Sequence, residues 1–143
     1  MRRDVTDADQ VRAALQQVVD VFGRVDVVVN NAGQGLQATV EEVDIADARA
    51  VLELNVLAPL VVMQAAAPLL RATGGGSIVN VSSGTTLAAA PGTGPCAASR
   101  AALEMTSGAR FDPPEKVAEA VLEVVRTGAA QVDVVPAAYG GSA

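Results

Sequence analysis

The chain has 143 residues, of which half are hydrophobic and only 2% are aromatic, and it carries a net charge of −6. This length predicts one domain with a core of small aliphatic side chains, and the acidic balance argues against a nucleic-acid partner because phosphate contacts need clustered Lys and Arg. With no histidine and a single cysteine, the sequence excludes His bases, His metal ligands and an internal disulfide, so we expect no metal and a reducing, cytoplasmic location.

The N-terminal part of the chain predicts a helix followed by a buried strand. Thr6 with Asp9 resembles a capping box, and apolar residues recur at helical spacing from there to Gly23. The strand is expected at residues 25–30. Its sequence, VDVVVN, is nearly continuous valine, which is typical of a parallel strand covered on both faces.

A long helix is expected next. Thr39 with Glu42 offers a second capping box, and the helical stretch continues to about Arg71. Pro59 cannot donate to the carbonyl of Asn55, four residues earlier, so we expect a kink there and an unused Asn55 carbonyl. Polar residues and prolines interrupt the apolar run, and we therefore expect no membrane span.

The second half of the chain repeats the alternation of strand and helix. A strand is expected at residues 77–81, a helix from about Cys96 to Gly108, another helix after Asp112, and a third strand at residues 131–135. Valine-rich strands alternating with helices indicate a parallel α/β sheet with helices on both faces. We predict one domain over residues 1–136, with the second strand central, and a disordered tail over residues 137–143.

Several short motifs, in order along the chain, resemble the short-chain dehydrogenase/reductase family. They are Asp4-Val5, NNAG at residues 30–33, Asn55-Val56, GSIVNVSS at residues 76–83, AASRAAL at residues 97–103 and the segment from DPPEK to DVVP. Each match is weak by itself, but their order and spacing together are specific. The resemblance implies a Rossmann-like sheet that binds NAD or NADP and transfers hydride between the cofactor and a carbonyl or alcohol.

The resemblance also implies roles for particular residues. The active-site positions of the family fall on Asn55, Ser83, Cys96 and Arg100. The cofactor-binding positions fall on Asp4, Val5, Asn31, Ala32, Gly33 and, again, Arg100.

The sequence departs from the family pattern in three ways. It lacks the Gly-rich TGxxxGxG turn and the βαβαβ half that carries it, and it lacks a segment after Phe111, so we expect a truncated and internally deleted member. The family's Tyr-x-x-x-Lys falls on Cys96 and Arg100. A thiol is shorter than a phenol, and Arg cannot shuttle a proton.

Structural interpretations compete with these roles. Asn30 would tie strand to loop by hydrogen bonds, Asn55 would satisfy backbone groups beside Pro59, and Cys96 would be a small buried hydrophobe. The alternative for Cys96 is a reactive thiolate tuned by Arg100.

We expect a family member that is inactive as an isolated chain, a pseudoenzyme; the alternative is a non-catalytic, helix-mediated interaction protein. Because the first strand has an unpaired apolar edge, we also expect self-association.

Overall fold

The computed structural model describes residues 3–86, 90–107 and 122, and within them it has two parallel strands and a set of helices. The strands β1 (Val27–Asn30) and β2 (Ser77–Asn80) run side by side in register, so that Val27 pairs with Ser77 and Asn30 with Asn80. The predicted parallel pairing is therefore confirmed. Apart from residue 122, the structure does not describe the residues of the predicted third strand, of the helix after Asp112 or of the tail at residues 137–143. The predicted cover on both faces of the sheet depends on those same residues.

Helix α1 (Ala8–Phe22) begins two residues later than the sequence predicts, and its cap is different. Asp7 is the N-cap and accepts hydrogen bonds from the backbone N–H groups of Asp9 and Gln10, at 2.9 and 3.1 Å. The predicted capping box at Thr6 was wrong, because the Thr6 hydroxyl donates instead to Asp4 Oδ1 at 2.8 Å. The C-terminus follows the sequence: Gly23 adopts a left-handed φ of 79°, which glycine accepts without strain, and donates to Val19.

The second capping box was also wrong. Thr39 does donate to the Glu42 carboxylate at 2.8 Å, but this pair closes a turn rather than opening a helix. Helix α2 (Ile45–Leu52) begins after Asp44, whose carboxylate accepts from the Ala46 N–H at 2.6 Å. A carboxylate acceptor at the N-cap satisfies backbone donors that the distant Thr39 cannot reach.

Just before Pro59, where the sequence predicts a kink, the structure has a π-helical turn, η1 (Glu53–Leu57), between α2 and α3 (Ala58–Ala72). The backbone N–H of Ala58 bonds to the carbonyl of Glu53, five residues earlier. Pro59 then lies in the first turn of α3, where its missing N–H costs little. A π-turn commonly marks a functional site, and here it carries Asn55.

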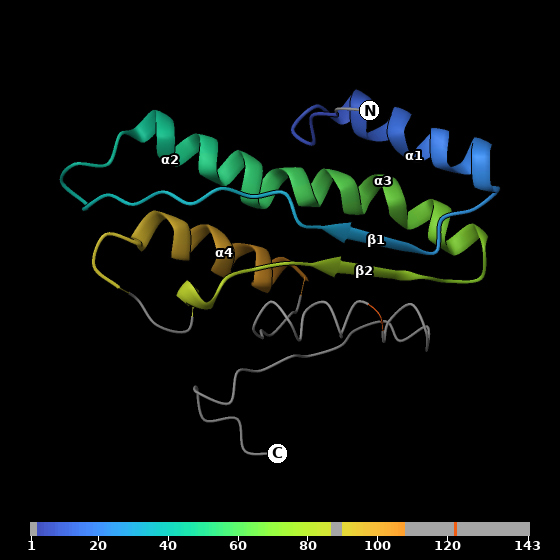
Figure 1. The fold of residues 1–143 in the computed structure, drawn as a ribbon. Helices are drawn as coiled ribbons and strands as arrows, with labels where there is room; N and C mark the ends of the chain where they lie inside the picture. Colours follow the sequence, from blue (N-terminus) through green and yellow to red (C-terminus); the bar gives the residue numbers. More distant parts are fainter. Residues whose placement is uncertain (1–2, 87–89, 108–121, 123–143) are drawn as a thin grey trace, which may run out of the picture.

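The hydrophobic core lies where α1, α3 and the two strands meet, and Figure 1 shows how these elements are arranged. Helix α3 packs on α1 and on both strands, and α4 (Gly94–Ser107) packs on β2 and η1. Val25, Ala66 and Leu70 form the buried cluster, and Val28 and Ile78 pack against it. Val29 is 43% exposed, so the face of β1 that carries it has little cover within the described residues.

The α2–η1–α3 helix, residues 45–72, is long and apolar enough to cross a membrane by length and composition, with a mean hydropathy of 1.7 in its most apolar window. Helices α1 and α4 and both strands pack on it, and 28% of that window is buried in the structure. A core helix of a soluble protein passes the same test of length and composition. The absence of a membrane partner therefore stays a prediction.

Candidate functional site

The carboxyl ends of β1 and β2 lie next to one another, at the edge where open α/β sheets bind ligands. A side-chain hydrogen bond of 2.7 Å from Asn30 Nδ2 to Asn80 Oδ1 joins the two ends. The Val81 N–H extends the ladder to the Asn30 carbonyl at 2.9 Å. The Asn30 side chain thus ties β1 to β2, whereas the structural interpretation of the sequence expects it to tie strand to loop. The loops that leave this edge carry most of the predicted site.

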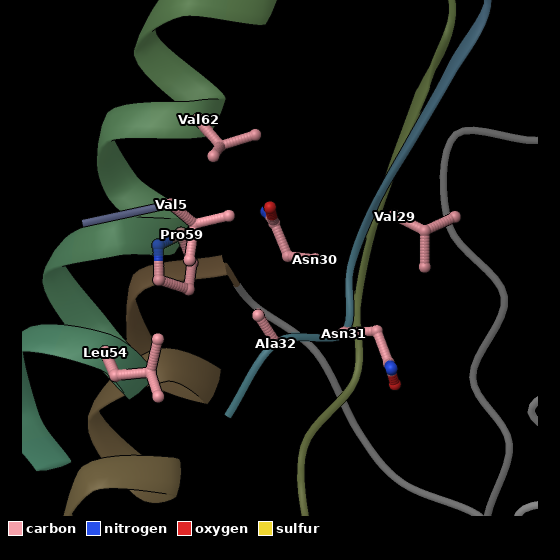
Figure 2. Close-up of a pocket in the computed structure, with 8 residues that line it drawn as sticks. All are labelled: Val5, Val29, Asn30, Asn31, Ala32, Leu54, Pro59 and Val62. Carbon is pink, nitrogen blue, oxygen red and sulfur yellow. The ribbon is translucent and has the colours of Figure 1, made fainter. Parts of the chain in front are cut away.

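A cleft beside this edge collects most of the residues that the sequence assigns to the cofactor. Its inner part, about 50 Å³, is lined by Val5, Asn31 and Ala32 together with residues of η1 and α3. In Figure 2, Val5 and Ala32 lie near Leu54 and Pro59, and the side chains of Asn30 and Asn31 point in opposite directions.

An adjoining open cavity of about 630 Å³ shares Val5, Ala32 and Leu54 with the inner cleft. The other residues that line it are Arg3, Asp4 and Gln10. Asp4 Oδ1 accepts hydrogen bonds from the N–H and the hydroxyl of Thr6, at 2.9 and 2.8 Å, which fixes the carboxylate at this rim. Of the predicted cofactor residues, Asp4, Val5, Asn31 and Ala32 therefore share one surface.

Asn55 is fully buried and connects three segments of the chain. Its Oδ1 accepts from the Gln34 N–H at 3.0 Å, and its Nδ2 donates to the Gln34 carbonyl at 2.9 Å and to Ser99 Oγ at 2.9 Å. Ser99 in turn donates to the Cys96 carbonyl at 2.7 Å. The side chain of Asn55 therefore holds the loop after β1 against η1 and α4, and its catalytic role stays a prediction.

Ser99 is the member of this network that the sequence reasoning missed. It is fully buried on α4, one residue before Arg100. A polar residue at that place in a small-residue helix is a signal of a buried hydrogen bond, since buried polar groups need partners. Its partner, however, lies 44 positions away in the chain. Only the fold brings the two side chains together.

Ser83 follows β2 and opens the short turn η2 (Gly84–Thr86). Its Oγ accepts from the N–H and the hydroxyl of Thr85, at 3.3 and 3.0 Å, and its carbonyl accepts from Thr86. The neighbouring Ser82 hydroxyl donates to Glu104 of α4 at 3.3 Å. The Ser82 side chain thus bonds to α4, whereas the Ser83 side chain bonds within the η2 turn. Ser83 Oγ remains able to donate one hydrogen bond.

Arg100 reaches from α4 back to the sheet edge. Its Nη1 donates to the Val81 carbonyl at 3.0 Å, and its guanidinium lies against Gly33. Both residues were assigned to the cofactor, yet in this structure they contact each other. Cys96, one turn earlier on α4, is half-buried, and its backbone carbonyl bonds to Ser99.

These residues fit only one part of a nicotinamide dinucleotide. The joined cavities at Asp4, Val5 and Ala32 have room for an adenosine group. The described residues offer no Gly-rich turn at a helix N-terminus for a pyrophosphate, and Arg100 is engaged with Val81. Within residues 3–86, 90–107 and 122, no group of His, Cys, Asp or Glu could hold a metal ion.

Comparisons with known proteins agree with this fold. The family model described as "short chain dehydrogenase" matches residues 1–133, and the chain belongs to this family. A curated oxidoreductase, BOA17 of Botryotinia fuckeliana, is 44% identical over 80 residues, which is 56% of this chain and 29% of the relative.

Solved structures give the same result. A gluconate 5-dehydrogenase from Burkholderia cenocepacia with NADP and tartrate is 34% identical, with a TM-score of 0.68 over 73% of this chain and 41% of that one. A 7α-hydroxysteroid dehydrogenase with NADH and 7-oxo glycochenodeoxycholic acid is 30% identical, with a TM-score of 0.71 over 75% and 42%. The chain spans less than half the length of each of these proteins.

Proposed function

We propose that this chain derives from an NAD(P)-dependent oxidoreductase, keeps the surface for the adenosine part of NAD or NADP, and by itself does not reduce carbonyls. Membership of the short-chain dehydrogenase family supports the first part, and similar proteins bind NADP or NADH. The second part rests on the cleft at Asp4, Val5, Asn31 and Ala32. A cytoplasmic location is part of the same proposal.

The observation that carries the loss of activity is the position of Arg100. In the family pattern this place belongs to a lysine that supports the tyrosine and the cofactor ribose. Here the guanidinium donates to the Val81 carbonyl at 3.0 Å and lies on Gly33. A guanidinium also stays protonated at all relevant pH values, so it relays no proton.

Cys96 gives the second reason. It occupies the place of the tyrosine that donates a proton to the developing alkoxide. Losing a positioned general acid typically costs about 10²- to 10⁴-fold in rate. Ser83 can still hold a carbonyl oxygen, but one hydrogen bond replaces neither the proton donor nor the positioned cofactor.

Titration of the purified chain with NADH and NADPH, followed by fluorescence and by thermal shift, tests the proposal. We expect weak binding that adenosine monophosphate displaces. Ala32→Leu fills the cleft and should weaken binding, whereas Ala13→Leu, at an exposed position of α1, should not. Equal binding by both variants would contradict the assignment of the cleft.

A second candidate function is helix-mediated association, and the surface of the long helix favours it. Ile45, Leu52 and Leu57 on this helix are 60%, 43% and 47% exposed. Apolar side chains grouped on one element commonly mark an interface. Light scattering over a range of concentrations tests this function. We expect a mass above that of one 14.4 kDa chain, and Leu57→Lys should lower that mass. A monomer at every concentration would contradict this function.

A further inference from the structure

Arg100 and Gly33 occupy one another's space. A Cβ built on Gly33 would lie 2.8 Å from Arg100 Cζ and 3.1 Å from Nη1, and it would overlap Nη2. Such separations are shorter than van der Waals contact, so any larger residue at position 33 displaces the guanidinium. Gly35, two residues later in the same loop, would meet nothing within 4 Å. Of the two glycines in this loop, only Gly33, the one under Arg100, therefore has no room for a side chain.

The guanidinium touches the segments that follow the two strands. Gly33 follows β1, Val81 follows β2, and Arg100 donates to the Val81 carbonyl at 3.0 Å. Arg100 Nε is buried with no hydrogen-bond partner among the described residues. A buried unpaired donor costs free energy, so the remaining contacts of this side chain must offset it.

We propose that Arg100 is a structural clamp that holds the loop of residues 31–35 to the end of β2, and that Gly33 is glycine because the guanidinium lies on it. The clamp goes beyond the proposed function and does not depend on whether a nucleotide binds. It gives Arg100 a role that a lysine could not fill, because the planar fork covers Gly33 while one arm reaches Val81. Arg100 is a positioning residue here, acting on the backbone at the sheet edge.

A double-mutant cycle tests the clamp in the full chain. Gly33→Ala should lower the folding equilibrium constant about 5-fold, because the displaced guanidinium gives up its hydrogen bond to the Val81 carbonyl. In an Arg100→Ala background the same substitution should change it less than about 2-fold, because the obstacle is gone. Gly35→Ala is the matched control and should be near neutral in both backgrounds. If Gly33→Ala alone does not fold, the double variant should restore folding; equal losses in both backgrounds would overturn the proposal.

Chemical modification gives a readout that stability alone would not move. Phenylglyoxal reacts with accessible guanidinium groups, and the side chains of Arg12 and Arg24 are 62% and 54% exposed. Peptide mass spectrometry should show Arg100 reacting several-fold more slowly than either arginine. Gly33→Ala should remove that protection under conditions where the variant is folded. Reaction of Arg100 at the rate of Arg12 in the unsubstituted chain would refute the clamp.

Discussion

Replacing Asn55 with alanine tests whether this residue holds the fold together. The substitution removes three hydrogen bonds, two to the Gln34 backbone and one to Ser99 Oγ, all between 2.9 and 3.0 Å. At about 1 kcal/mol net for each bond, and with a small cavity at a fully buried position, the loss should be about 3–4 kcal/mol. That loss corresponds to a change of roughly 10²- to 10³-fold in the folding equilibrium.

Urea unfolding followed by circular dichroism measures this loss. Asn31→Ala is the control, since Asn31 is exposed just after β1 and should change stability by less than about 0.5 kcal/mol. If Asn55→Ala does not fold, Ser99→Ala still reports on the network, with an expected loss of about 1 kcal/mol. A loss for Asn55→Ala no larger than that of the control would refute the structural role of Asn55.

Two further predictions concern α1 and the start of β2. Hydrogen bonds from Gln10 lower the pKa of Asp7 from its ordinary 3.8. The stability that this cap contributes is therefore present above the unfolded-state pKa and is lost as the pH falls through the lower folded-state pKa. Asp7→Asn should flatten the fall in urea midpoint as the pH drops below about 4, and an unchanged slope would contradict this. Gly76→Ala would place a Cβ 2.5 Å from the Asp26 carbonyl oxygen and should lower the free energy of unfolding by about 1–3 kcal/mol, as measured by thermal unfolding. Gly84→Ala is the control and should change it little, because a Cβ there meets nothing within 4 Å. Equal effects of the two substitutions would count against the close approach at Gly76.

The sequence predicted the strand pairing because the pattern that carries it is local. The apolar runs at β1 and β2 are typical of parallel strands whose two faces are covered by helices. Two such strands joined through a helix pair in parallel. Helix ends were harder to predict. Thr6 and Thr39 have the spacing of capping boxes, but Asp7 and Asp44 are stronger acceptors placed nearer to the actual helix starts.

The candidate site could be predicted only in part. The motifs identified residues of the cleft, such as Val5 and Ala32, because these motifs resemble the ones that bind the cofactor in the family. The partners of Asn55 and Arg100 could not be found in the same way. Ser99, Val81 and Gly33 are distant in sequence, and hydrogen bonds across 19 to 44 positions depend on how α4 packs.

The most direct test of the central claim is carbonyl reduction by the purified chain. Oxidation of NADH and of NADPH should be followed with a broad panel of ketones and aldehydes, for the unsubstituted chain and for the Cys96→Tyr/Arg100→Lys double variant. We predict no substrate-dependent oxidation by either protein, because the 143 residues contain no TGxxxGxG sequence to place the pyrophosphate and hydride donor. Substrate-dependent oxidation by the unsubstituted chain or by the double variant would contradict the account.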